Sequence, residues 1–320
     1  MKFNLPHVYT AEEVIDKAFK QGAKSAKIIR STPAPRLRRM RDSEKRRIVV
    51  ASRAIEGCLR PLVKQFPSYE QLPPFYQKLL EIKITKDRYK KNLGAVQWAL
   101  NNASQIRNET IKEITRKETR PSIEYLGRVA SIIKKIRKEL DDLIEIKEIL
   151  LNFPAVEDLP TIVIAGYPNV GKSTFTKTLT GSNVKIASYP FTTQDILVGH
   201  KKTRYVNYQI IDSPGILERP MGERNEIEMQ AVLAIKELAD AVLFIIDPTQ
   251  DLARQKTLLS EMEKDFGVQV FIALNKADIA PKEKIEEAIK EFSGYEVYVI
   301  TAKDPVECEK IFDKIAAAIK

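Results

Sequence analysis

Two kinds of hydrophobic pattern divide the chain near its middle. After residue 160, short apolar runs alternate with segments whose apolar residues recur at helical spacing. This alternation predicts strands and helices in turn, and so a mostly parallel sheet with helices on both faces. We expect six strands. Five are predicted at 161–166, 206–212, 241–247, 268–275 and 296–301, and the sixth pairs with 206–212 in an antiparallel hairpin around GHKKTRYVNY (199–208).

The first half of the chain has no comparable series of strands. Thr10 and Glu13 have the spacing of a capping box, which predicts a helix start. Segment 86–118 contains no proline and places its apolar side chains on one face. In segment 122–151 apolar residues recur every three or four positions, which predicts one long helix packed in a bundle or an antiparallel hairpin.

The change of pattern predicts two domains. We expect an all-α bundle over residues 1–158 and an α/β domain over residues 159–320, with the proline-containing stretch 152–160 as the joint. The prolines in FPSYEQLPPFY (66–76) indicate a connector between two helices of the bundle.

Charge is distributed unevenly between these domains. Residues 1–160 carry 33 Lys and Arg against 20 Asp and Glu, whereas residues 161–320 carry 20 against 23. A surface rich in both Lys and Glu is one alternative, but it does not explain an excess of one sign. The excess, densest in RLRRMRDSEKRR (36–47), favours a polyanionic partner for the first half.

Targeting signals and membrane spans are not expected. No run of about 18 apolar residues occurs, and the N-terminal residues lack the apolar core of a secretory signal. The two cysteines lie far apart and match no metal-binding spacing. We therefore expect a cytoplasmic protein with free thiols.

GYPNVGKSTF (166–175) has the spacing of a loop that wraps the phosphates of a nucleotide. It lies between a predicted strand and a predicted helix, as such a loop requires. Lys172 is expected to reach the β- and γ-phosphates, and the Ser173 hydroxyl to hold Mg²⁺. The predicted phosphate-binding residues are Asn169, Val170, Gly171, Lys172, Ser173 and Thr174.

DSPG (212–215) follows the next predicted strand. Asp212 is placed to bind Mg²⁺, and the Gly215 amide to sense the γ-phosphate. Two more short motifs follow later strands, and open α/β sheets bind their ligands at this edge. Four motifs in this order predict one nucleotide site.

The motifs NKAD (275–278) and TAK (301–303) indicate guanine. The Asp278 carboxylate can accept hydrogen bonds from N1–H and the exocyclic amine of guanine, a donor pair that adenine lacks. GTP is therefore favoured over ATP, and an ATP-dependent enzyme is disfavoured. Asn275 supports the loop and the base, and the stem of Lys276 covers the ring. Thr301, Ala302 and Lys303 form the last loop, in which the Ala302 amide can meet the guanine carbonyl.

Residues 161–303 resemble the translation-factor class of GTPases, and YPFTT (189–193) resembles switch I of its Obg branch. Together with PSYEQLPPFY and KDRYKKNLG, the segments GYPNVGKSTF, YPFTTQDILVGH and IDSPGILERPMGERNEIEMQA resemble the Nog group, nucleolar GTP-binding protein 1 and its archaeal relatives. The resemblance covers nearly the whole chain. It implies a P-loop GTPase fold, GTP or GDP with Mg²⁺, and a magnesium contact from Thr193 or its neighbour Thr192. Lys172, Thr193 and Gly215 are the residues that it implies in catalysis.

The resemblance also implies a partner, the precursor of the large ribosomal subunit. We expect the bundle to dock on ribosomal RNA through phosphate contacts, with no membrane or DNA partner and a monomer away from the ribosome. Two alternatives remain at this point. One is a non-ribosomal signalling GTPase whose bundle binds protein, and the other is a bundle that self-associates through 122–151.

Hydrolysis is expected to be slow. Ras-like GTPases place a water-orienting Gln directly after the DxxG glycine, whereas this chain has Ile216, which has no polar side-chain atom. In other GTPases with a similar PNVGKS loop, the residue that corresponds to Asn169 helps to coordinate K⁺. Potassium dependence and a purely loop-shaping role are the two alternatives for Asn169.

Overall fold

The computed structural model describes residues 3–114, 121–181, 185–188, 195–212, 215, 217–218 and 225–319. It consists of two compact units. The helical unit comprises Phe3–Leu72 and Lys83–Leu151, and the α/β unit comprises Pro73–Ile82 and the chain from Asn152 onward. Within the described ranges, no helix is long and apolar enough to cross a membrane.

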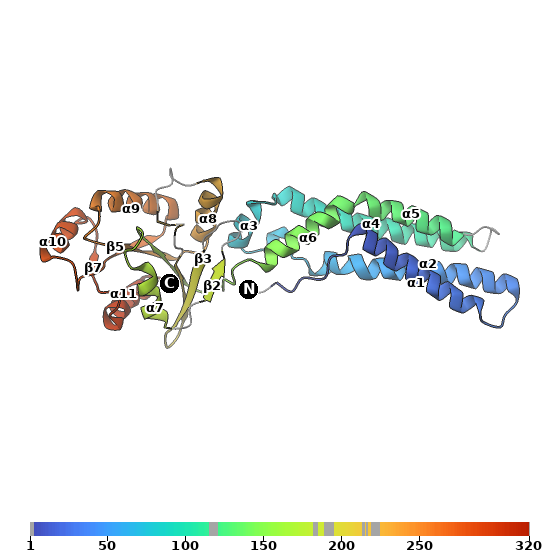
Figure 1. Cartoon of the computed structure of the whole chain (residues 1–320), viewed down its shortest axis with the longest axis horizontal. Coiled ribbons are helices and arrows are strands. Elements are labelled where there is room, and N and C mark those ends of the chain that lie inside the picture. Colours follow the sequence, from blue (N-terminus) through green and yellow to red (C-terminus); the bar gives the residue numbers. More distant parts are fainter. Residues whose placement is uncertain are drawn as a thin grey trace. The chain divides into compact units, whose positions relative to one another are not determined.

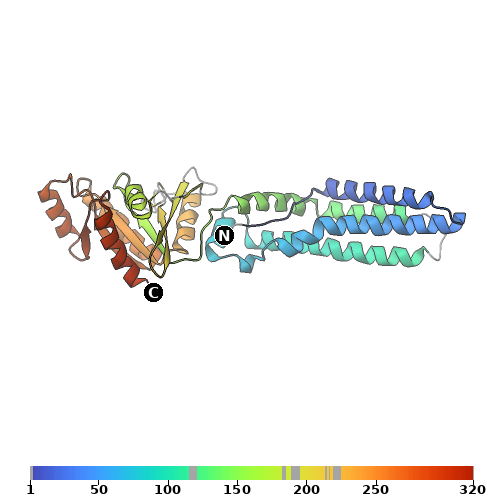
Figure 2. The same cartoon turned by 90° about the horizontal axis from the view of Figure 1, so that it is seen from below.

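The helical unit is an antiparallel arrangement of long helices (Figures 1 and 2). The Thr10 capping box is present, because Glu13 N donates to Thr10 Oγ1 and Thr10 N donates to the Glu13 carboxylate. The apolar faces, including Ile48, Val96 and Tyr125, are fully buried. The elements are α1 (Ala11–Arg30), α2 (Arg36–Gln65), η1 (Tyr69–Gln71), α4 (Lys86–Glu113), α5 (Pro121–Lys135) and α6 (Arg137–Leu151).

The prediction of a single long helix over 122–151 is wrong. The structure has two helices, α5 and α6, which meet at Ile136. There the Ile136 amide donates to Ile133 O at 3.2 Å, one residue closer than an α-helical bond, and Leu140 N restarts the helical pattern by donating to Ile136 O. Ile136 is buried, so the apolar spacing continues across the break and gives no sign of it.

The α/β unit contains a mostly parallel sheet, which confirms the predicted fold class. Its strand order is β2-β3-β4-β1-β5-β6-β7, and only the β2–β3 and β3–β4 pairs are antiparallel. The sheet has seven strands instead of the six expected, because β2 adds an edge strand to β3. The strands are β1 (Thr161–Ala165), β2 (Lys185–Ser188), β3 (Asp195–Lys202), β4 (Asn207–Asp212), β5 (Ala241–Ile246), β6 (Gln269–Leu274) and β7 (Val297–Val299).

Helices cover both faces of this sheet (Figure 1). On one face, Phe175 of α7 (Lys172–Thr180) and Phe312 of α11 (Pro305–Ala318) pack with Ile164 and Ile245. The alternate residues of the same strands point to the other face, where α8 (Glu226–Lys236) and α9 (Leu252–Phe266) lie. Helix α10 (Lys282–Glu291) connects β6 to β7.

One helix from the first half of the sequence belongs to the α/β unit. Helix α3 (Pro74–Glu81) begins inside the stretch expected to be a connector, and it packs against α8. The Tyr76 hydroxyl donates to Pro154 O at 2.9 Å, and Val156 N donates to the same hydroxyl at 3.1 Å. The chain therefore leaves the helical unit after Leu72, contributes α3 to the α/β unit, and returns to the helical unit at Lys83.

Candidate functional site

The phosphate loop depends on two glycines. Gly166 has φ 141°, and a Cβ there would lie 2.3 Å from Ile245 O. Gly171 has φ 105°, and a Cβ there would lie 2.2 Å from Asn275 Nδ2. An L side chain fits neither the backbone conformation nor the space, so only glycine allows the loop to turn closely between β1 and the start of α7.

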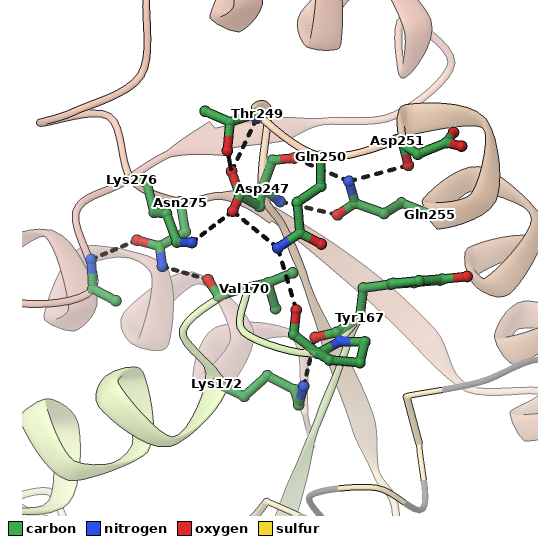
Figure 3. A network of polar contacts seen from close by, with 12 residues as sticks. Tyr167, Val170, Lys172, Asp247, Thr249, Gln250, Asp251, Gln255, Asn275 and Lys276 are labelled. Atoms are coloured by element: carbon green, nitrogen blue, oxygen red, sulfur yellow. Dashed lines mark hydrogen bonds and ion pairs between the residues drawn. The ribbon is translucent and has the colours of Figure 1, made fainter.

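Asn275 brings three of the sequence motifs together (Figure 3). Its Nδ2 donates to Val170 O of the phosphate loop at 2.7 Å, and its Oδ1 accepts from Ala302 N at 2.7 Å. Asn275 is 4% exposed, so both hydrogen bonds are shielded from water. The phosphate loop, NKAD and TAK segments thus meet at one edge of the sheet, as a single nucleotide site requires.

Lys172 is buried at the start of α7, and all three of its ammonium hydrogens have partners. Nζ donates to Gly166 O at 3.0 Å and to Tyr167 O at 2.7 Å, and it lies 2.8 Å from Glu218 Oε1. A lysine ammonium has only three donors. A phosphate that binds Lys172 must therefore displace one of these groups, and the Glu218 carboxylate is the competing anion.

Ser173 and Asp212 provide the oxygen atoms of a possible magnesium site. Ser173 Oγ donates to Asp212 Oδ2 at 2.6 Å, whereas Asp212 Oδ1 is buried without a hydrogen-bond partner among the described residues. Burial raises the pKa of Asp212, although the Ser173 hydrogen bond and Lys172 oppose the shift. Hard oxygen donors with one unsatisfied carboxylate oxygen fit Mg²⁺.

The predicted base-binding residues occupy the loops after β6 and β7. Asp278 is exposed on its loop, and Lys276 has a left-handed backbone with φ 63°. The Lys276 ammonium is paired with Asp247, and Thr301 N donates to Glu307 Oε2 at 2.6 Å. Of the remaining predicted residues, Ala302 is buried and Thr174 and Lys303 are exposed.

Some predicted residues cannot be placed. Thr192, Thr193 and Ile216 lie outside the described residues. Gly215 is described and has φ 78°, a conformation that favours glycine. Asn169 has φ 61°, which asparagine tolerates better than most side chains.

The structure also identifies three residues that sequence reasoning missed. Glu218 contacts Lys172, and Asp247 and Gln250 lie between the phosphate loop and the loop that carries Lys276 (Figure 3). A signal for Asp247 existed, because AVLFIID ends in an acid just as VNYQIID ends in Asp212. No local pattern marks Glu218 or Gln250.

Two family models match consecutive parts of the chain. The model described as the NOG1 N-terminal helical domain matches residues 3–157. The model described as a 50S ribosome-binding GTPase matches residues 161–276. Together they span the helical segments of the first half and the strands β1 to β6 of the α/β unit, which is called the GTPase unit from here on.

Relatives match over most of this chain. Protein MJ1408 of Methanocaldococcus jannaschii is 36% identical over 291 residues, which cover 88% of this chain and 82% of that protein. Nucleolar GTP-binding protein 1 of Arabidopsis thaliana is 34% identical over 79% of this chain, and that of Saccharomyces cerevisiae 29% identical over 92%. The matches span only 39% and 48% of those two eukaryotic proteins.

Proposed function

Because this chain belongs to the Nog1 family of GTPases, we propose that it acts as a GTP-dependent switch in assembly of the large ribosomal subunit. In this proposal GTP and Mg²⁺ bind at the edge of the sheet, and the helical unit docks on ribosomal RNA. The family descriptions and the names of the eukaryotic relatives support the ribosomal assignment.

One observation carries the nucleotide part of the proposal, namely the pair of hydrogen bonds by which Asn275 joins the phosphate loop to the last loop. They bring the Asp278 loop close to the phosphate loop, so that one nucleotide can contact both. We assign guanine recognition to Asp278, phosphate binding to Lys172, and magnesium binding to Ser173 and Asp212, with Thr193 as a further ligand. Bound Mg²⁺ neutralises phosphate charge during transfer of the γ-phosphoryl group.

The intrinsic rate of hydrolysis is low in this proposal, because Ile216 offers no polar atom to orient water. Segments 187–195 and 213–226 respond to the γ-phosphate and Mg²⁺ and so report the bound nucleotide. Turnover in K⁺ and Na⁺ buffers tests whether Asn169 helps to bind a potassium ion. Equal rates assign Asn169 a loop-shaping role.

The hairpin of α1 and α2 is the proposed RNA-binding surface. Eight of its exposed cations form no ion pair with a described residue: Lys24, Lys27, Arg36, Arg41, Lys45, Arg46, Arg53 and Lys64. The cations at the start of α4, by contrast, are neutralised locally. Lys86 and Lys90 pair with Glu70, Arg88 with Asp142, and Lys91 with Glu139. Most of the exposed cations without an ion pair in the described part of the helical unit therefore lie on the α1–α2 hairpin, where phosphates can be bound, and Lys134, Lys135 and Lys138 are the others.

The test is co-sedimentation of the full chain with ribosomal precursor particles from the native cell, in GTP, GDP and no nucleotide. We expect association with large-subunit precursors that differs between GTP and GDP. Association that is the same in all three conditions would contradict the switch. No association in any condition, together with specific GTP binding, would favour a signalling GTPase outside the ribosome.

A further inference from the structure

A buried carboxylate outside the recognised motifs lies between the two halves of the nucleotide site (Figure 3). Asp247 directly follows β5 and is 1% exposed. Neither the phosphate loop nor the base-recognition motif includes it. A buried acid at the ligand-binding edge of the sheet is costly unless its charge is compensated, so its partners indicate its use.

Its partners saturate the carboxylate and hold it in one orientation. Oδ1 accepts from Thr249 N at 2.9 Å and from Thr249 Oγ1 at 2.7 Å. Oδ2 accepts from Lys276 Nζ at 2.6 Å and from Gln250 Nε2 at 3.2 Å. The backbone of Asp247 is fixed as well, because it exchanges two hydrogen bonds with the fully buried amide of Gln255.

The contact with Lys276 is the one that joins Asp247 to the NKAD loop, the proposed base-recognition loop. Lys276 adopts a left-handed backbone conformation that residues other than glycine rarely take. Its side chain is 28% exposed, while that of Asp247 is 1% exposed. A long flexible stem is thus anchored at its charged end by a rigid buried group, so the methylene stem has a defined course beside the base-recognition loop.

Gln250 connects the same carboxylate to the phosphate loop. Its Nε2 lies 3.2 Å from Asp247 Oδ2 and 3.2 Å from Pro168 O, between Gly166 and Gly171. The loop of Lys276 and the phosphate loop are therefore linked at two places, by Asn275 to Val170 and by Asp247 and Gln250 to Pro168.

We propose that Asp247 is a positioning residue for guanine binding, which holds the Lys276 stem against the base and, through Gln250, keeps the base loop in register with the phosphate loop. The inference rests on the proposed guanine site. Asp247 acts through Lys276 and does not touch the nucleotide itself. Its effect should consequently appear with ligands that contain the base and not with the phosphates alone.

Binding of GDP and of inorganic pyrophosphate to the full chain, measured by calorimetry in Mg²⁺, separates these contributions. Asp247→Asn keeps the shape of the side chain and removes its charge. We expect the Kd for GDP to rise about tenfold or more and the Kd for pyrophosphate to change less than about twofold. Asp313→Asn, an exposed position on α11, is the matched control and should leave both values unchanged.

A second comparison tests whether the effect passes through Lys276. Lys276→Met keeps an apolar stem and removes the ammonium group. If Asp247 acts by positioning Lys276, Asp247→Asn combined with Lys276→Met should bind GDP within about twofold of Lys276→Met alone. Unchanged GDP binding by Asp247→Asn overturns the inference. Equal losses of affinity for GDP and for pyrophosphate, together with a loss of GDP affinity that adds in full to that of Lys276→Met, overturn it as well. Failure of the proposed function is distinct, since the unmodified chain would then show no preference for GDP over ADP.

Discussion

Asp278 is the side chain on which the choice of purine depends in the proposed site. In Asp278→Asn the amide cannot accept both guanine donors, and each charge-assisted hydrogen bond contributes about 1.5–3 kcal/mol. We expect GTP binding to weaken on the order of a hundredfold. Xanthine presents a carbonyl where guanine has its amine, so xanthosine triphosphate should bind the variant better than GTP does. Competition binding with both nucleotides measures the switch, and an unaltered preference would remove Asp278 from base recognition.

In the proposed site, Glu218 competes with the nucleotide phosphates for Lys172. Its carboxylate lies 2.8 Å from Lys172 Nζ, in a pocket where Lys172 is 4% exposed. Two anions cannot share this ammonium group without strong repulsion, so Glu218 must move when nucleotide binds. Glu218→Gln should therefore tighten GTP binding, by about tenfold. Glu286→Gln, an exposed change on α10, should have no effect. Weaker GTP binding by Glu218→Gln would instead show that Glu218 supports the bound state.

The buried carboxylate of Asp212, the proposed magnesium ligand, should lower the stability of the ligand-free protein. Burial raises its pKa, so the ionised carboxylate destabilises the ligand-free fold above that pKa, and this cost disappears as the pH falls through it. We expect Asp212→Asn to raise the free energy of unfolding at neutral pH by about 1–3 kcal/mol in EDTA. The gain should vanish on acidification, and magnesium-dependent GTP binding should be lost. Urea unfolding at two pH values with GTP titration measures both, and a destabilised variant would contradict the argument.

Residues in short contiguous motifs could be predicted from the sequence, because their spacing is set by the local backbone. Gly166, Gly171 and Asn275 come from such motifs, and the structure places them in contact with each other's loops. Glu218, Asp247 and Gln250 were missed, since their partners lie far away in sequence. Which groups meet depends on the register of β5 with its neighbours and on the course of the loops, and neither follows from spacing.

At the scale of elements, helix α3 raises the question of which unit it stabilises. Leu79 of α3 and Leu62 of α2 are both fully buried, and removal of a buried leucine side chain costs about 2–5 kcal/mol. The contacts of α3 with α8 place Leu79 in the GTPase unit, whereas Leu62 belongs to the helical unit with the rest of α2. Leu79→Ala should lower the stability of the GTPase unit, and Leu62→Ala that of the helical unit.

GDP distinguishes the two units, because a ligand stabilises only the unit that binds it. In thermal unfolding of the full chain, the transition that GDP shifts upward should be the one that Leu79→Ala lowers. Leu62→Ala is the matched control and should lower the other transition. If Leu79→Ala leaves the GDP-sensitive transition unchanged, α3 does not contribute to the nucleotide-binding unit.

Element type was predictable where the hydrophobic period was sustained, as in β1, β4, β5 and α9. The break between α5 and α6 and the start of α3 were not predictable in this way. The apolar spacing continues on both sides of Ile136, and the prolines before α3 indicated a connector although Pro74 starts a helix. The assignment of α3 to the GTPase unit depends on tertiary packing of Phe75, Tyr76 and Leu79, which a helical pattern alone cannot direct to one partner.

At the scale of the whole molecule, the structure shows where the excess positive charge of the first half is exposed. The count over residues 1–160 favoured a polyanionic partner for the first half as a whole. Glu70, Asp142 and Glu139 pair with the cations at the start of α4, whereas Arg41, Lys45 and Arg46 on α2 are exposed without ion pairs among the described residues. Composition gave the sign of the partner's charge, and the fold shows that the α1–α2 hairpin carries most of the exposed, unpaired cations in the described part of the helical unit.

Two triple variants that lose the same number of positive charges separate the effect of the α1–α2 hairpin on RNA binding from the effect of the overall charge of the chain. Replacing Arg41, Lys45 and Arg46 by Gln removes cations that are free to bind phosphates. Replacing Lys86, Lys90 and Lys91 by Gln removes cations that already pair with Glu70 and Glu139. For binding to large-subunit precursors across a salt titration, we expect the first variant to reduce the slope of log K against log[salt] by about two to three, since each lost phosphate contact contributes nearly one. The second variant should change the slope by no more than about one, because Glu70 and Glu139 neutralise two of its three cations and paired cations release few counterions. Equal effects of the two variants would mean that only net charge matters and that the α1–α2 hairpin is not the docking surface.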